Sequence, residues 1–232
     1  MARGSLGMIR LEHITKVYHA DGLPVRALSG IDLSISPGAF AVLAGPSGSG
    51  KSTILHLIGA LDRPSEGRVL IEGDDLYRRS RKELADFRLH KIGFVFQAYN
   101  LIPVLTAREN VEYPLLLQRI PPDGRRARSE DLLRRVGLGD QSGKRPGEMS
   151  GGQQQRVAVA RALAARPRII LADEPTANLD SKTGSELIDL FRELNEQYKV
   201  TFVFASHDPM VIRRAHQIVR LKDGRVEGEE RQ

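Results

Sequence analysis

The sequence predicts an α/β fold with a largely parallel central sheet. Residues 39–44, 169–172 and 200–205 are short and almost entirely apolar, which is typical of strands buried on both faces of a parallel sheet. Stretches with helical apolar spacing, such as 181–197, separate or follow these runs. Strands that alternate with helices favour parallel pairing, with ligands bound at the carboxyl ends of the strands.

The first part of the chain is expected to form strands. Residues 8–14 and 31–35 alternate apolar and polar side chains, as half-exposed strands do. A Pro-Gly pair at 37–38 predicts a turn ahead of the first buried strand. A glycine-rich loop comes after that strand, and a helix is expected at about 51–61.

The middle of the chain, from about residue 98 to 165, has no strand signal. Loops that contain proline alternate there with helical patterns, for example at 129–136. Strand and helix signals return beyond it, with a short helix from about residue 209 and a hairpin at 218–226 around an Asp-Gly turn. The helical middle is therefore interpreted as an inserted subdomain, and not as an independent domain.

Composition excludes several classes of protein. The 232 residues are 41% hydrophobic and 28% charged, which suits a globular core and argues against disorder. The longest unbroken apolar stretch, 39–44, is far shorter than the roughly 18 residues of a membrane span. No charged-then-apolar leader opens the chain, so no secretory signal is expected. Because the chain has no cysteine, disulfides, thiol catalysis and thiolate metal sites are excluded.

The net charge of +6 comes from 35 Lys and Arg against 29 acidic residues. The Arg-rich stretches 78–82 and 125–128 are not interleaved with aromatic residues, and Trp is absent, unlike in base-stacking modules. A solvated surface is the first interpretation of this charge and a lipid-facing bias is the second. No nucleic-acid partner is expected.

The glycine-rich segment at 45–52 carries the strongest functional signal. It matches the pattern G-x-x-x-x-G-K-[ST], follows a predicted buried strand and opens a predicted helix. Its glycines allow successive backbone N–H groups to face an anion, and the helix adds its positive N-terminal end. Lys51 is predicted to reach the outer phosphates, and Ser52 to coordinate Mg²⁺. A purely structural glycine turn is the alternative, which this context disfavours. The predicted nucleotide-binding residues of this segment are Gly45, Pro46, Ser47, Gly48, Ser49, Gly50, Lys51, Ser52 and Thr53.

Two acidic residues follow the apolar run 169–172. A carboxylate at the end of a strand beside a phosphate cradle holds Mg²⁺ directly or through water, which suits Asp173. Glu174 would then lie next to the γ-phosphate, and we expect it to polarise an attacking water. Because many strands end in a charged turn, this acidic pair indicates a catalytic site only in combination with the phosphate loop.

Residues 149–153, Met-Ser-Gly-Gly-Gln, precede that strand and closely resemble the Leu-Ser-Gly-Gly-Gln signature of ATP-binding cassette (ABC) ATPases. The order of motifs resembles this family over essentially the whole chain. The resemblance implies the following roles: adenine stacking for Tyr18, catalysis and metal binding for Gln97, catalysis for Lys51, nucleotide binding for Ser150, Gly151, Gly152, Gln153 and Asp180, metal binding for Ser52 and Asp173, and catalysis for Glu174 and His207.

The same resemblance implies a fold and cofactors. Residues 1–232 would form one ABC ATPase domain, a P-loop NTPase core with a largely parallel sheet. An N-terminal antiparallel β-subdomain and the α-helical subdomain at about 98–165, inserted in the core, would complete it. ATP and Mg²⁺ are the implied cofactors.

The signature also implies a partner. Residues 150–152 stand just before a predicted helix, whose N-terminus is a second anion-binding site. In the family this site faces the nucleotide held by the other protomer. The chain has one phosphate loop and one signature, so a second copy is expected to pair with it head to tail around ATP.

Three of these residues have ordinary structural alternatives. Tyr18 could be a surface aromatic, although its spacing before the phosphate loop favours stacking. Gln97 follows the apolar residues 94–96, and a plain loop glutamine is the alternative. His207 lies just after the run 200–205, where a residue at the start of a helix is common; only the resemblance assigns it a catalytic role.

The sequence departs from the family pattern at two places. Met149 stands where the signature has Leu, a nearly volume-conserving change, and the loop that ends in Asp180 reads Ala-Asn-Leu-Asp. Neither change touches a phosphate-contacting position. Residues 57–67, 94–103, 109–114 and 150–156 resemble lipoprotein-releasing and macrolide-exporting ATPases, in which ATP drives a membrane partner. ATPases of cell-division and amino-acid-import complexes share many of these residues and are the alternatives.

A membrane permease is therefore an expected partner. The chain would dock on a separately encoded permease, or be a piece of a fused one, as a peripheral subunit at the cytoplasmic face of the inner membrane. Residues 98–103 lie where the family receives the coupling helix of the permease, and the apolar Tyr99, Leu101 and Ile102 suit that contact.

Two rival functions explain less of the sequence. Soluble cassette ATPases of DNA repair and translation typically carry a long coiled-coil insertion or two cassettes, and neither fits in 232 residues. A nucleotide kinase would explain the phosphate loop but not residues 150–153.

Overall fold

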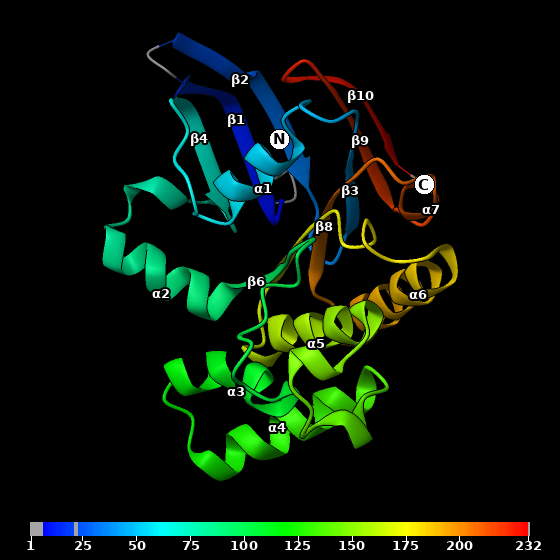
Figure 1. Cartoon of the computed structure of the whole chain (residues 1–232). Coiled ribbons are helices and arrows are strands. Elements are labelled where there is room, and N and C mark those ends of the chain that lie inside the picture. Colours follow the sequence, from blue (N-terminus) through cyan, green and yellow to red (C-terminus); the bar gives the residue numbers. More distant parts are fainter. Residues whose placement is uncertain (1–6, 21–22, 232) are drawn as a thin grey trace. The chain divides into compact units, whose positions relative to one another are not determined.

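The structure is a computed structural model that describes residues 7–20 and 23–231. The chain divides into two compact units (Figure 1). The first unit comprises the residues up to Ala85 together with those from Asn195 onward, and the second comprises Asp86–Leu194. The second unit is thus one continuous segment, and the first is built from both ends of the chain.

The first unit contains a four-stranded antiparallel sheet in the order β2-β1-β4-β5. Ile9 is level with Ile35 on one side and with Ile71 on the other, and all three side chains are buried. His13, with φ of +49°, marks a shift in both registers of β1. The elements are β1 (Ile9–Ala20), β2 (Leu23–Ile35), β4 (Glu66–Ile71), β5 (Asp74–Asp75) and the short 3₁₀ helix η1 (Leu76–Arg78).

The first unit also contains buried parallel strands. β3 (Phe40–Ala44) pairs in parallel with β8 (Thr201–Ser206) on one side and with β9 (Gln217–Lys222) on the other. Every residue of β3 and β8 is buried, and the rings of Phe40 and Phe204 stack with their centroids 4.5 Å apart. The remaining elements here are β10 (Arg225–Arg231), antiparallel to β9, and the helices α1 (Lys51–Ile58) and α7 (Pro209–Ile212).

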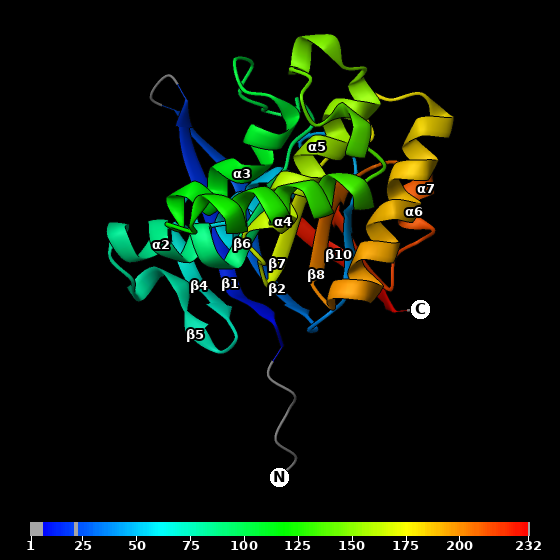
Figure 2. The same ribbon diagram turned by 90° about the horizontal axis from the view of Figure 1, so that it is seen from below.

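The second unit combines two parallel strands with packed helices. β6 (Ile92–Val95) and β7 (Ile169–Asp173) are level at Val95 and Ala172. Helices α3, α4 and α5 all contact one another (Figures 1 and 2). Their bounds are α3 (Ala107–Leu117), α4 (Pro122–Arg135) and α5 (Gly151–Ala164), with the short η2 (Gly139–Gln141) and η3 (Pro146–Glu148) between α4 and α5. α2 (Arg81–Lys91) and α6 (Ser181–Tyr198) cross the boundary between the units.

The structure confirms the predicted α/β fold class, with an antiparallel sheet and a mostly parallel one. The hairpin around Asp223 and Gly224 is confirmed as β9–β10. The helix expected at 51–61 is shorter, because it ends at Ile58 and Ala60 takes a positive φ of +54°. The boundaries of the helical subdomain at about 98–165 stay a prediction. No helix among the described residues is long and apolar enough to cross a membrane.

Candidate functional site

The phosphate loop connects β3 to α1 in the first unit and is closely packed. Gly48 and Gly50 have φ of +79° and +99°, a backbone conformation that favours glycine. A Cβ on Gly50 would lie 2.6 Å from Leu28 Cδ2 and 3.0 Å from the Ala27 carbonyl oxygen. Conformation and space therefore both require glycine at this position.

Several polar groups of this loop have no partner in the described chain. α1 has no side-chain cap, and the N–H groups of Ser47, Gly48 and Gly50 donate no hydrogen bond to a described residue. The Ser49 hydroxyl is buried and also lacks a hydrogen-bond partner there. Unpaired N–H groups at the start of a helix form a site that fits phosphate.

Lys51 adds a positive charge to the same loop. Its side chain is 6% exposed, and Nζ donates hydrogen bonds to the carbonyl oxygens of Gly45 (2.8 Å) and Pro46 (2.9 Å). The ammonium group therefore lies against the loop whose bound phosphates it would neutralise. Burial next to carbonyl oxygens keeps the charge close to any bound phosphate, where a point charge stabilises most.

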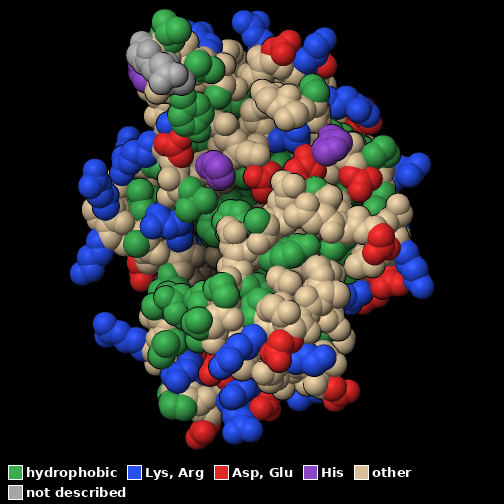
Figure 3. All heavy atoms as spheres, viewed as in Figure 1, with side chains coloured by type: hydrophobic (Ala, Val, Ile, Leu, Met, Phe, Trp, Pro, Cys, Tyr) green, Lys and Arg blue, Asp and Glu red, His purple; other side chains and the backbone are tan. Residues whose placement is uncertain are grey.

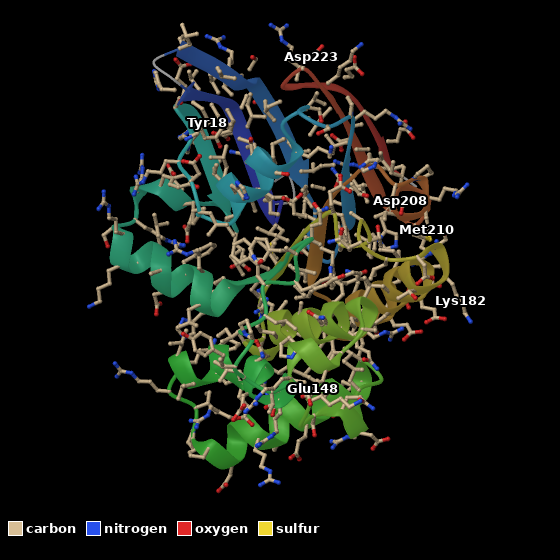
Figure 4. All side chains as sticks on the ribbon, in the orientation of Figure 1. Tyr18, Glu148, Lys182, Asp208, Met210 and Asp223 are labelled. Atoms are coloured by element: carbon tan, nitrogen blue, oxygen red, sulfur yellow. The ribbon has the colours of Figure 1, made fainter. Side chains whose placement is uncertain are left out.

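His207 lies at the same edge of the sheet as the phosphate loop. Ala44 is level with Ser206 in the parallel pair β3–β8, so Gly45 and His207 are the next residues on neighbouring strands. The His207 side chain is exposed. Asp208 follows and caps α7, because its Oδ1 accepts a hydrogen bond from Met210 N at 2.8 Å (Figure 4). The structure thus places His207 after a strand and immediately before a capped helix.

Tyr18 on β1 is part of a cluster next to α1 (Figure 4). Lys16 Nζ lies 4.7 Å from the Tyr18 ring centroid and donates to Asp62 Oδ1 at 2.7 Å. Asp62 and Thr53, the latter in α1, both hydrogen-bond the Tyr18 hydroxyl. Burial and the hydrogen bond to Asp62 raise the pKa of Tyr18. The ring remains 38% exposed, which leaves aromatic surface for stacking beside the phosphate loop.

In the second unit the structure brings Gln97 and Glu174 together. Val95 is level with Ala172, so both residues follow neighbouring strand ends. Glu174 has φ of +42°, an uncommon conformation for a residue with a side chain, and such strain is often found at functional sites. Asn178 Nδ2 donates to the Gln97 carbonyl oxygen at 3.0 Å, which ties the two loops to each other.

The signature forms the capped N-terminus of α5. Ser150 Oγ accepts a hydrogen bond from Gln153 N at 3.3 Å, and Gln153 Oε1 accepts one from Ser150 N at 2.9 Å. This capping box satisfies two backbone groups within the chain. A Cβ on Gly151 would lie 2.7 Å from Tyr99 Oη, and one on Gly152 would lie 2.5 Å from Thr183 Cγ2. A side chain at either position would therefore force Tyr99 or Thr183 to shift.

Asp180 has a clear local role. Its Oδ1 accepts hydrogen bonds from Lys182 N (3.1 Å) and Thr183 N (3.0 Å), and its Oδ2 accepts one from Thr183 Oγ1 (2.6 Å). The hydrogen bonds from Thr183 lower the pKa of Asp180. The carboxylate thus caps α6 while charged, and nucleotide binding by Asp180 stays a prediction.

The predicted residues divide between the units. Tyr18, the phosphate loop and His207 belong to the first unit, and Gln97, the signature, Asp173, Glu174 and Asp180 to the second. Two polar residues were missed: Lys16 below the Tyr18 ring, and Gln155, whose side chain is fully buried in α5. The sequence places Gln155 within the stretch 150–156 that resembles the family, but it assigns this residue no role of its own.

The donor groups fit Mg²⁺ better than a transition metal. In the ranges 7–20 and 23–231 no group of three or more His, Cys, Asp and Glu residues could hold a metal ion. The predicted ligands Ser52, Gln97 and Asp173 offer oxygen atoms, which Mg²⁺ prefers, and Mg²⁺ commonly takes further ligands from substrate phosphates.

Similarity to known proteins assigns the family. The ABC transporter family matches residues 28–177. The chain belongs to this family. It is an ABC ATPase cassette, and 50% of its residues are identical to an ABC transporter ATP-binding protein of Thermotoga maritima, over 97% of this chain and 95% of that protein.

Two further relatives and one solved structure sharpen the comparison. Lipoprotein-releasing system ATP-binding protein LolD 1 of Rhodopseudomonas palustris is 48% identical over 95% of this chain and 99% of its own. Macrolide export ATP-binding/permease protein MacB 1/2 of Paracoccus denitrificans is 46% identical over all of this chain, which spans only 34% of that relative. The dimeric cassette MJ0796 bound to ADP and Pi has a TM-score of 0.89 and 46% identity, over 97% of this chain and 98% of that one.

Proposed function

We propose that the chain is the ATP-hydrolysing subunit of a transporter that drives a separate membrane permease in lipoprotein release or efflux. The observation that carries this proposal is the presence of a complete phosphate loop and a complete signature in one cassette. The LolD relative, matched over 99% of its length, supports lipoprotein release, and the MacB relatives support efflux.

The phosphate loop supplies the nucleotide site of the chain itself. Unpaired N–H groups and the N-terminus of α1 bind the phosphates of ATP, and Lys51 neutralises the outer ones. Tyr18 stacks on the adenine, because its exposed ring lies next to Thr53 of α1.

The carboxyl ends of β6 and β7 supply the groups for hydrolysis. Asp173 and Gln97, together with Ser52, would supply oxygen ligands to Mg²⁺, which would offset the phosphate charge. Glu174 orients the attacking water and accepts its proton, and its strained backbone fixes the direction of the carboxylate. His207, which follows β8 at the level of Gly45, contacts the outer phosphate side of the site.

A second copy completes the site. The signature is the N-terminus of a 14-residue helix, and an anion held there gains from the helix dipole. We place the nucleotide of the partner copy at this N-terminus, so that two chains pair head to tail with ATP between them. The dimeric structures of MJ0796 support this arrangement.

The permease contact is proposed on the second unit. Hydrophobic side chains gather over α3 on the face that Figure 3 shows. Val104, Tyr113, Leu116 and Leu117 are exposed by 42% to 74%, whereas the predicted contact residues 99, 101 and 102 are half-buried. A membrane protein that covers these side chains would hold the chain at the cytoplasmic face of the inner membrane as a peripheral subunit.

The substitution Glu174→Gln tests this assignment. The amide keeps the shape of the side chain but accepts no proton, so ATP binding should survive while hydrolysis falls by about two to four orders of magnitude. The variant should then accumulate as an ATP-bound dimer, which size-exclusion chromatography in Mg²⁺-ATP detects. Asp173→Asn should weaken Mg²⁺-dependent binding as well as turnover.

Glu193→Gln is the matched control, because Glu193 is an exposed residue of α6 and the substitution makes the same charge change. It should leave turnover and the monomer–dimer equilibrium unchanged. Near-wild-type turnover in Glu174→Gln would mean that another residue activates the attacking water, and His207 would be the first candidate. Co-purification of the chain with a membrane permease tests the partner, and co-purification with ribosomes or nucleic acid instead would contradict the transport function.

A further inference from the structure

Gln155 holds both loops that carry the predicted hydrolytic residues. Its side chain is fully buried in the second turn of α5. Nε2 donates to the Pro175 carbonyl oxygen at 2.8 Å and to the Phe96 carbonyl oxygen at 3.4 Å. Pro175 directly follows Glu174, and Phe96 directly precedes Gln97. One amide group therefore fixes the backbone next to each of these two residues.

The backbone at this point needs an external support. Glu174 has φ of +42°, a conformation that persists only when neighbouring contacts impose it. The bond from Gln155 to the Pro175 carbonyl oxygen restrains the peptide immediately after the strained residue. Gln155 thus stabilises the conformation that directs the Glu174 carboxylate.

The oxygen atom of the same amide makes the glutamine costly at this position. Gln155 Oε1 is buried and has no hydrogen-bond partner among the described residues. A buried unpaired acceptor destabilises the folded state, and a leucine or methionine of similar size would avoid that cost. The benefit of a glutamine here is its donor, which reaches two loops at once.

A second pair of hydrogen bonds ties the loop after Gln97 to the same helix. Arg161, two turns further along α5, donates to the carbonyl oxygens of Tyr99 (2.9 Å) and Asn100. Tyr99 and Asn100 both have positive φ, at +60° and +49°. The signature at the start of α5 and the loop after β6 are therefore held by one rigid helix.

We propose that Gln155 is a positioning residue that couples the signature to hydrolysis. When the nucleotide of the partner copy binds at the N-terminus of α5, the helix shifts, and Gln155 transmits that shift to Glu174 and Gln97, about 7 Å along the helix axis. Each chain then hydrolyses its own ATP efficiently only when its signature is occupied. This inference rests on the head-to-tail dimer proposed above.

The substitution Gln155→Leu tests the coupling, with Gln155→Met beside it as a more flexible residue of similar volume. Both remove the donor. We expect kcat to fall about tenfold to a hundredfold, the effect of a misplaced reacting group. The hydrolysis rate should no longer depend cooperatively on the ATP concentration. The affinity of the isolated chain for ADP should stay within about twofold of the wild type, because the phosphate loop is intact.

Gln118→Leu is the matched control. Gln118 Nε2 also bridges two carbonyl oxygens, of Leu89 (3.1 Å) and of Ala165 (3.3 Å) at the opposite end of α5. Its loss should lower the thermal unfolding temperature without a change in kcat or cooperativity.

Two results would overturn the role of Gln155. One is a kcat of both Gln155 variants within twofold of the wild type. The other is a fall in kcat for Gln118→Leu as large as that of the Gln155 variants, which would mean that lost thermal stability alone explains the effect. If the wild-type chain does not hydrolyse ATP and the Glu174→Gln variant does not dimerise with ATP, the proposed function itself is contradicted.

Discussion

Two helix N-termini among the described residues are glycine-rich, and they differ in how many of their polar groups the protein itself pairs. α1 follows Gly50 with no side-chain cap, and the N–H groups of Ser47, Gly48 and Gly50 donate no hydrogen bond to a described residue. α5 begins at Ser150 with a complete capping box, in which Gln153 returns the hydrogen bond. Lys51 adds a buried ammonium to the first, and the second has no equivalent.

The difference separates a primary binding site from an auxiliary one. The phosphate loop leaves donors and a positive charge for a ligand, so we expect it to bind nucleotide within one chain. The signature uses the N–H groups of Ser150 and Gln153 in its own capping box, so fewer donors remain there for a ligand, and the helix dipole contributes about 0.3–1 kcal/mol at exposed sites. In the proposed head-to-tail pair, the signature would therefore strengthen the binding of a nucleotide that the other copy already holds.

The largest effect is expected for Lys51→Ala. Loss of the ammonium leaves the outer phosphates without their charge partner, so affinity for ATP should fall about a hundredfold, the upper end for a charged hydrogen bond. Nucleotide titration of the isolated chain measures it. Lys222→Ala, which removes an exposed lysine of β9, should bind as the wild type does. Equal affinity of Lys51→Ala and wild type would contradict the distinction between the two helix N-termini.

A smaller effect is expected for Gly152→Ala. The new methyl group would lie 2.5 Å from Thr183 Cγ2, and Thr183 is held in place by its hydrogen bond to Asp180. Forcing this contact should destabilise the fold by about 1–3 kcal/mol. Thr183→Ser removes the methyl but keeps the hydroxyl, so the double variant should recover most of the loss in thermal unfolding. Absence of that rescue would mean that the signature is not packed against α6 as described.

The smallest effect is expected for Ser150→Ala. Loss of the cap should lower the unfolding free energy by about 1 kcal/mol. Binding of ADP to the isolated chain should not change, because the phosphate loop is untouched. ATP-dependent dimerisation in the Glu174→Gln background, followed by sedimentation, should weaken severalfold. A loss of ADP affinity as large as that of Lys51→Ala would mean that the two N-termini are not separate sites.

The sequence predicts well what depends on local pattern. The phosphate loop and the signature are contiguous motifs, and the buried strands β3, β7 and β8 are almost wholly apolar, so both appear without any knowledge of long-range contacts. The turn at 223–224 is likewise fixed by two adjacent residues.

The sequence predicts poorly what depends on partners distant in the chain. α3 contains Pro114, which argues against a helix, yet the capping box of Thr106 and Glu109 and contacts with α4 and α5 maintain it. α2 has few apolar residues and no clear periodicity. The role of Gln155 is set by carbonyl groups 59 and 20 residues away, which no local pattern indicates.

The tight turn between β9 and β10 also limits how the chain can be engineered. Surface turns with an Asp-Gly pair are usually favoured points for inserting a tag or opening the chain. Here a Cβ on Gly224 would lie 2.6 Å from the Ala27 carbonyl oxygen, Ser29 N donates to the Gly224 carbonyl oxygen at 2.9 Å, and a Cβ on Gly50 of the phosphate loop would lie 3.8 Å from Gly224 Cα. The turn lies next to the phosphate loop, so tags should be inserted, and new termini of circular permutants placed, elsewhere in the chain.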